Sequence, residues 1–139
     1  MVELIVENKI EKLLAGKAIV TFLSKRTNNH FTYKIKKHKE YDLFYVSVKT
    51  GTEYSYMGTL YIKDNYRKLN CTPKSKVPYD AKSFIAFQWV LDVLHTNSNA
   101  PDLEIYHEGC CCKCGRPLTT PESIKLGIGP ECAKHLKLI

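Results

Sequence analysis

The last third of the chain, residues 107–138, constrains the fold most because it holds five of the six cysteines. Cys111 and Cys114 form a CxxC pair that Gly115 follows directly, and Cys132 comes after a further seventeen residues. Zinc prefers thiolate and imidazole ligands in a closed tetrahedral site, and the CxxC spacing lets two sulfurs reach one ion. The pattern therefore predicts one structural zinc ion bound by these three cysteines and a fourth ligand.

The residues before Cys132 indicate how the third sulfur is positioned. Glycine followed by proline marks the start of a helix, here at Gly129 and Pro130. A thiolate in the first turn of a helix is stabilised by free N–H groups and by the helix dipole. A CxxC knuckle followed by a ligand at a helix N-terminus is typical of a treble-clef zinc module, which we expect over residues 107–139.

The residues alone leave the fourth ligand open between two histidines. His135 lies three residues after Cys132, on the same face of the predicted helix, and His107 lies four residues before Cys111. Spacing favours His135 slightly, because it completes a CxxC–CxxH pattern. Whichever histidine does not bind the metal is expected to be a solvated surface residue.

The roles of the other cysteines, Cys71, Cys110 and Cys112, are left open by the sequence. Cys110 and Cys112 stand at the wrong distance from Cys114 to form a knuckle with it. Disulfide pairing would need an oxidising compartment, and the N-terminal residues do not have the pattern of a signal peptide. We therefore expect reduced thiols, a metal ion and a cytoplasmic location.

The length and composition predict one core with a small appendage rather than several domains. No apolar run approaches the roughly 20 residues that a membrane-spanning helix needs. The formal net charge is +7, which permits binding to nucleic acid or to acidic proteins. The oligomeric state is not readable from the sequence.

Residues 1–106 are expected to form an α+β core domain. Apolar residues at helical spacing from Val2 to Leu14 predict an N-terminal helix that ends near Gly16. The pattern then alternates with period two, which predicts a twisted antiparallel sheet of four to five strands packed by one or two helices. The expected strands cover residues 18–24, 31–37, 43–48, 53–62 and, as a short fifth, 66–70, with a further strand over 103–106 leading into the zinc module. In the fourth of these, Tyr54, Tyr56, Leu60 and Ile62 are expected to share one face.

A second helix is expected over residues 80–95, with Asp80 as its capping residue. Phe84, Phe87, Leu91 and Leu94 predict one apolar face, and Ile85, Trp89 and Val93 predict a second. With two apolar faces the helix is expected to be mostly buried against the sheet, with Trp89 as a core anchor.

Catalysis is not expected from the motifs in this chain. There is no glycine-rich phosphate loop and no Ser-His-Asp or Cys-His arrangement. A site closed by four protein ligands leaves no open position on the zinc for a substrate. The spacing of His107 and Glu108 also differs from the deaminase pattern, in which glutamate stands two residues after histidine.

The segment Cys111–Cys132 resembles a motif of small bacteriophage and prophage proteins that reads CxxCGRxLTxPxSI followed by GIGPxC. Similar proteins often carry His-Glu-Gly before the knuckle, as His107–Gly109 do here. The upstream strands at Phe31–Tyr33 and Tyr54–Gly58 and the helix with Trp89 also resemble that group. The resemblance implies a phage origin and a zinc module, and it favours His107 over His135 as the fourth ligand. It implies no activity, because the family's biochemical role is unassigned.

Together these features favour a phage-encoded, zinc-stabilised, non-catalytic binding protein that contacts nucleic acid or a nucleic-acid-processing complex. Tyrosines on a sheet edged by cations can stack bases and hold phosphates. An alternative is an inhibitor that binds a host enzyme or an anti-phage defence protein directly, and a third possibility is an assembly component. The residues expected to contact nucleic acid are Lys34, Lys36, Lys37, Arg67 and Arg116.

Overall fold

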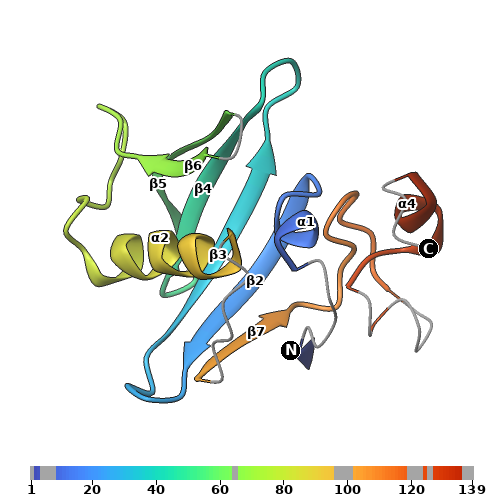
Figure 1. Cartoon of the computed structure of the whole chain (residues 1–139), viewed down its shortest axis with the longest axis horizontal. Helices are drawn as coiled ribbons and strands as arrows, with labels where there is room; N and C mark the ends of the chain where they lie inside the picture. Colours follow the sequence, from blue (N-terminus) through green and yellow to red (C-terminus); the bar gives the residue numbers. More distant parts are fainter. Residues whose placement is uncertain are drawn as a thin grey trace.

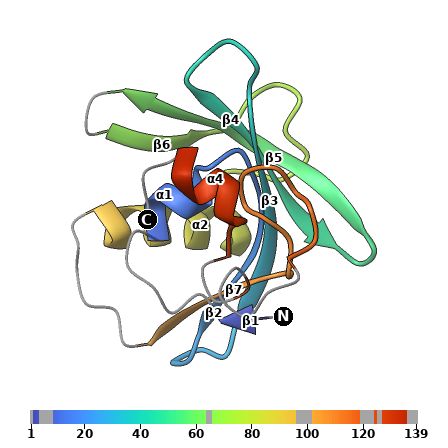
Figure 2. The same ribbon diagram turned by 90° about the vertical axis from the view of Figure 1, so that its right-hand side faces the viewer.

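A seven-stranded antiparallel sheet curls around two helices in the computed structural model of the chain (Figures 1 and 2). The structure describes residues 2–3, 9–63, 66–95, 102–118, 124 and 127–135. The strand order is β1-β7-β2-β3-β4-β5-β6, so the C-terminal strand lies between the first two. The strands are β1 (Val2–Glu3), β2 (Lys17–Ser24), β3 (His30–Lys37), β4 (Leu43–Thr50), β5 (Glu53–Lys63), β6 (Tyr66–Asn70) and β7 (Leu103–His107), and the helices are α1 (Lys9–Leu13), α2 (Lys82–His95) and α4 (Pro130–His135).

The predicted antiparallel sheet is confirmed, with more strands than expected. Strands β2 to β6 follow one another as a meander, each paired with the next. The strand expected over 103–106 is β7, which joins the sheet by pairing with β2, and β1, which pairs with β7, was not expected. Both lie on the side of the sheet that continues into the C-terminal segment (Figure 1).

The core lies between the concave face of the sheet and α2. Phe87 of α2 packs against Phe22 and Tyr33, with ring centroids 5.8 and 5.0 Å away. The hydroxyl of Tyr33 donates a hydrogen bond of 2.7 Å to the carbonyl of Ser83, which ties β3 to the first turn of α2. Every second residue of the strands faces this core, among them Val20, Ile35, Val46, Leu60 and Leu69, all buried.

The predicted N-terminal helix is wrong for the first residues of the chain. Val2 and Glu3 pair with His107 and Tyr106 of β7, so they form a strand. The described helix, α1, covers only Lys9–Leu13, and residues 4–8 lie outside the described part. Apolar periodicity could not foresee this, because the pairing partner is the edge of a strand a hundred residues away.

The predicted face of β5 is also wrong, because the strand contains a β-bulge. Val46 pairs with Gly58 and Ser47 pairs with Tyr56, so Met57 is an extra residue in β5. A bulge shifts the alternation by one residue, which sends the side chains after it to the opposite face. Tyr54 and Tyr56 therefore lie on the outer face of the sheet, whereas Leu60 is buried in the core.

Helix α2 buries one face rather than two. Phe84, Phe87 and Leu91 are buried as predicted, but Ile85 and Trp89 are 55% and 47% exposed, so Trp89 is not a core anchor. The curled sheet covers the side of α2 that carries Phe87, whereas Ile85 and Trp89 lie on an exposed side. No helix within the described residues is long and apolar enough to cross a membrane.

Candidate metal centre

The chain leaves β7 and folds into a tight hairpin that carries the CxxC pair. Cys110 bridges to Pro117, and the N–H of Cys111 donates to the carbonyl of Arg116 at 2.8 Å. The N–H of Gly115 then donates to the carbonyl of Cys111 at 2.8 Å, which closes the turn. Gly115 has a φ of +80°, a conformation that residues with a side chain rarely adopt. The sequence CxxCG thus forms a knuckle, as predicted.

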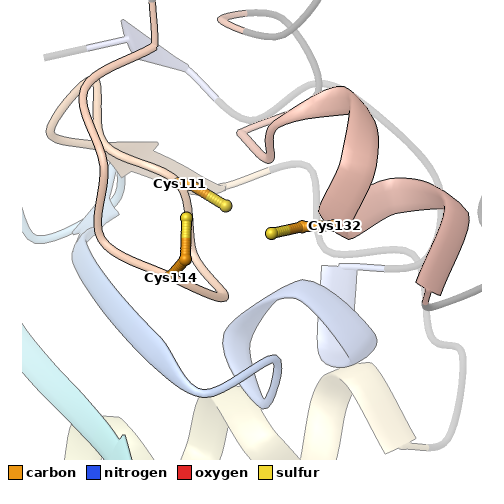
Figure 3. Close-up of side chains that lie close together, drawn as sticks. All are labelled: Cys111, Cys114 and Cys132. Atoms are coloured by element: carbon orange, nitrogen blue, oxygen red, sulfur yellow. The ribbon is translucent and has the colours of Figure 1, made fainter.

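The knuckle and α4 bring the sulfurs of Cys111, Cys114 and Cys132 together. These sulfur atoms all lie within 4.8 Å of one another, and Figure 3 shows the three side chains pointing toward a common centre. None of the three cysteines is in a disulfide. Sulfurs around a tetrahedral zinc with bonds of about 2.3 Å are separated by roughly 3.8 Å, so a small movement would close the cluster on an ion. The three cysteines could hold a metal ion.

Burial, backbone N–H groups and neighbouring sulfurs shift the pKa values of Cys111 and Cys132 in opposite directions. Burial raises the pKa of Cys111, but the backbone N–H groups of Gly129, Cys114 and Lys113 outweigh it and lower that pKa below its ordinary value. Burial and the neighbouring sulfurs raise the pKa of Cys132 to about 11. A cation at the centre would supply the positive charge that lets all three sulfurs ionise. The fit of these residues to a thiophilic metal is therefore good.

Cys112, between the two knuckle cysteines, ties the hairpin to the core. Its carbonyl accepts a hydrogen bond of 2.7 Å from the N–H of Lys17, and its own N–H donates to the carbonyl of Gly127 at 3.0 Å. Its side chain is buried in the main hydrophobic cluster, and this burial raises its pKa to about 12. A side chain on Gly16 would lie 3.0 Å from the carbonyl oxygen of Lys113, so the approach of the knuckle needs glycine there. Cys112 is thus a core residue.

His107 lies outside the group of three cysteines, although it is completely buried. Its Nδ1 accepts a hydrogen bond of 2.9 Å from the N–H of Gly109, and its Nε2 lies 2.6 Å from the carbonyl of Ile124, to which it donates. Burial lowers the pKa of His107, so the ring is neutral, as one accepting and one donating nitrogen require. The histidine that does not bind the metal was expected to be solvated, and His107 is instead buried. His135 is the last residue of α4, and its side chain lies outside the described part.

The remaining cysteines have separate environments. Cys110 takes part in the bridge to Pro117, at the base of the hairpin. Cys71 is exposed in the connector after β6, where its sulfur lies 3.7 Å from the carbonyl of Val77. Neither belongs to the metal-ligand group among the described residues.

The five residues predicted to contact nucleic acid do not share one surface. Lys34 and Lys36 are exposed on the outer face of β3. Lys37 lies at the end of that strand, paired with the buried Phe44. Arg67 lies on the α2 side, 2.8 Å from the ring of His95, and Arg116 is exposed on the knuckle.

Three outward residues that were not among the predicted contacts accompany Lys34 and Lys36. Tyr45 and Tyr61 are 42% and 47% exposed, and Lys68 is exposed opposite Tyr61. Tyr45 was detectable, because it alternates with buried residues in β4. Tyr61 likewise alternates with the buried Leu60, and the bulge at Met57 is what places it on the same face as Tyr54 and Tyr56.

Comparison with known proteins matches the C-terminal segment to one family. The model of a family of unknown function, DUF6011, matches residues 101–137. No curated protein and no solved structure matches the chain. The part of the chain that carries β7, the knuckle and α4 is therefore similar to an uncharacterised family, as the sequence motif predicted.

Proposed function

We propose that Cys111, Cys114 and Cys132 hold one structural zinc ion per chain. Three thiolates make a soft ligand set, and tetrahedral sites with sulfur ligands select zinc or iron–sulfur clusters. A single knuckle and one helix N-terminus suit one ion better than a cluster. When bound, the metal would link α4 to the hairpin and stabilise both.

We propose further that His135 closes the site and that His107 positions the hairpin. His107 already has a backbone partner on each ring nitrogen, and binding a metal would break one of these bonds. His135 follows Cys132 by three residues in α4, so it belongs to the same face of that helix.

Metal analysis of protein purified without chelator tests the site. We expect one zinc per chain, and loss of that zinc in Cys114→Ser and Cys132→Ser. His135→Ala should weaken zinc binding more than His107→Gln does. Protein that contains no zinc would contradict the proposal. A larger loss of zinc binding in His107→Gln than in His135→Ala would identify His107 as the fourth ligand.

The site is proposed to stabilise a non-catalytic protein that binds nucleic acid through the outer face of the sheet. The observation that carries this is the exposed side of β3 to β6, where lysines and tyrosine rings lie together. Lys34 lies with its Nζ 4.3 Å from the centre of the Tyr54 ring, and Lys36 is directly opposite Tyr45. Cations supply attraction to phosphates, and aromatic rings supply faces for bases. A phage origin and a place in the host cytoplasm are proposed from the sequence motif and the reduced cysteines.

Fluorescence anisotropy across a salt series tests this function. Binding should weaken linearly with salt on logarithmic axes, with a slope that counts the phosphates contacted. The double variant Lys34→Glu, Lys36→Glu should abolish binding at moderate salt. The matched control is the double variant Lys82→Glu, Lys134→Glu, which changes the net charge by the same amount at two exposed lysines of the helices α2 and α4. Equal losses in both would show that only net charge matters, and no binding at low salt would contradict the function.

A second function, inhibition of a host protein by direct contact, is favoured by a different surface. Ile85 and Trp89 are exposed one turn apart on α2, and Tyr79 is 72% exposed in the connector before it. Exposed aromatic anchors of this kind are common in protein interfaces. A stable stoichiometric complex that survives nuclease treatment and is lost in Trp89→Ala would support this alternative.

A further inference from the structure

The bulge in β5 gathers an unusual number of tyrosines on the outer face of the sheet. Tyr54 and Tyr61 are seven positions apart, so in a regular strand without the bulge at Met57 they would point to opposite faces. With it, both point outward, together with Tyr56. Tyr45 joins them from β4, because it pairs with Thr59 in the stretch after the bulge. Bulges often re-aim side chains in this way near functional surfaces.

The tyrosine rings on this face differ in how free they are. Tyr54 lies under the amine of Lys34, and the hydroxyl of Tyr56 shares a hydrogen bond of 2.7 Å with Thr59. Tyr45 and Tyr61 are more exposed, and Tyr61 is the diagonal neighbour of Tyr45 because it follows Thr59 by two residues. Diagonal neighbours on one face lie roughly 7–8 Å apart, within reach of aromatic side chains.

The aromatic surface continues from Tyr45 into the loop between β3 and β4. The ring centroid of His38 lies 5.8 Å from that of Tyr45 and 5.0 Å from that of Tyr41. Tyr41 is 62% exposed. The rings of Tyr41, His38 and Tyr45 thus form a continuous row on which successive planar groups of a ligand could stack.

Positive charges flank the exposed rings of Tyr45 and Tyr61 on both sides. Lys36 stands directly opposite Tyr45, and Lys68 stands directly opposite Tyr61. Acidic groups lie at both ends of the face. Glu53 begins β5, and Glu108 helps to raise the pKa of Tyr54, after the larger effect of burial. Glu40 and Asp42 are exposed in the loop between β3 and β4, beside Tyr41. Lys36 and Lys68 are thus the cations paired directly with the two exposed rings of the strands.

We propose that this face binds single-stranded nucleic acid, with bases stacked on Tyr45 and Tyr61 and phosphates held by Lys36 and Lys68. The inference rests on the proposed nucleic-acid function and names its substrate class. Aromatic rings on a sheet stack unpaired bases, as in other single-strand-binding sheets. A duplex hides its base faces in its own stack, so the rings could not contribute and only the lysines would bind it.

The test compares a labelled single-stranded oligonucleotide with a duplex of the same sequence, by anisotropy on the full chain. Tyr45→Leu and Tyr61→Leu remove the ring but keep an apolar side chain, and Tyr45→Phe and Tyr61→Phe keep the ring. We expect each Leu variant to weaken single-strand binding by about tenfold. The Phe variants should stay within about twofold of the parent, and circular dichroism would check that all of them fold.

The outcomes separate this inference from the function on which it rests. Preference for the single strand, lost in the Leu variants and kept in the Phe variants, supports the inference. Salt-dependent binding that is equal for both oligonucleotides and unaffected by the Leu variants overturns it and leaves the nucleic-acid function standing. Failure to bind either oligonucleotide at low salt overturns both. Lys68→Glu should lower the salt slope by about one, and an unchanged slope would remove Lys68 from the site.

Discussion

At the scale of single residues, Gly58 of β5 has no room for a side chain. A Cβ atom there would lie 2.3 Å from the carbonyl oxygen of Asn70, far inside contact distance. Strands β5 and β6 meet at this point, next to the bulge. The sequence suggested only that Gly58 interrupts a row of tyrosines, since the approach of β6 depends on pairing that local pattern does not reveal.

We predict that Gly58→Ala destabilises the fold by about 1–3 kcal/mol, because β6 has to move away from its partner. Denaturant titration of the purified protein measures this as a lower free energy of unfolding. Gly129→Ala is the control, since no atom lies within 4 Å of a Cβ there and its N–H to Cys111 is retained. A stability loss no larger in Gly58→Ala than in the control would contradict the close approach.

His107 makes a residue-scale prediction about pH. Burial lowers its pKa in the folded chain below the ordinary 6.5, so the unfolded chain takes up a proton first as the pH falls. Its contribution to stability is therefore complete above pH 6.5 and is lost progressively below it, by at most about 1.4 kcal/mol per pH unit. In His107→Gln the side chain still offers an acceptor and a donor but cannot be protonated.

Stability measured between pH 7.5 and 5 should thus fall less steeply in His107→Gln than in the parent protein. The exposed His30, changed to glutamine, serves as the control and should leave the steepness unchanged. Parallel curves for the parent and His107→Gln would show that this ring is not protonated on unfolding.

At the scale of elements, periodicity was a good guide where an element buries one face against a near neighbour. Strands β2 to β4 and the Phe84, Phe87 and Leu91 side of α2 follow it. It was wrong where distant pairing decides. Val2 and Glu3 form a strand because they pair with the end of β7. The bulge at Met57 places the side chains of β5 before and after it on faces that simple alternation does not predict.

The metal centre was the most predictable element, for a local reason. The CxxCG turn and the Gly-Pro helix start each fix their own geometry within a few residues. Only Cys132 depends on the chain folding back toward the knuckle, and the sequence motif includes the residues that make this connection. The burial and hydrogen bonds of His107 were not predictable, because its ring donates to the backbone carbonyl of Ile124, which lies beyond the knuckle.

Helix α2 yields an element-scale prediction through the single tryptophan of the chain. Trp89 lies on the side of α2 that the sheet leaves open, so the folded protein should emit at the wavelength of a solvated indole. Acrylamide should quench it to a substantial fraction of the quenching measured in denaturant. Blue-shifted emission with little quenching would mean that a partner or a second copy covers this face.

At the scale of the whole molecule, the segment with the cysteine cluster and the sheet form one connected structure. Strand β7 pairs with β1 and β2 and runs directly into the knuckle. The side chain of Cys112 lies in the main core, and Lys17 of β2 donates to its carbonyl. The predicted division at residue 107 thus falls at the last residue of a central strand, which leaves little freedom between the two parts.

We therefore predict that loss of the metal centre and unfolding of the core occur together. Cobalt, bound in place of zinc, reports the cysteine site by absorbance, and Trp89 reports α2 by fluorescence. Because Cys112 and β7 join the two regions, both signals should change over the same range of denaturant, as in a two-state transition. Chelation or Cys132→Ser should then lower the stability reported by Trp89 as well, since metal-binding energy becomes folding energy for the whole chain. The prediction would be contradicted if the cobalt absorbance were lost at denaturant concentrations where the fluorescence of Trp89 is still that of the native protein. The C-terminal module would then unfold independently of the sheet.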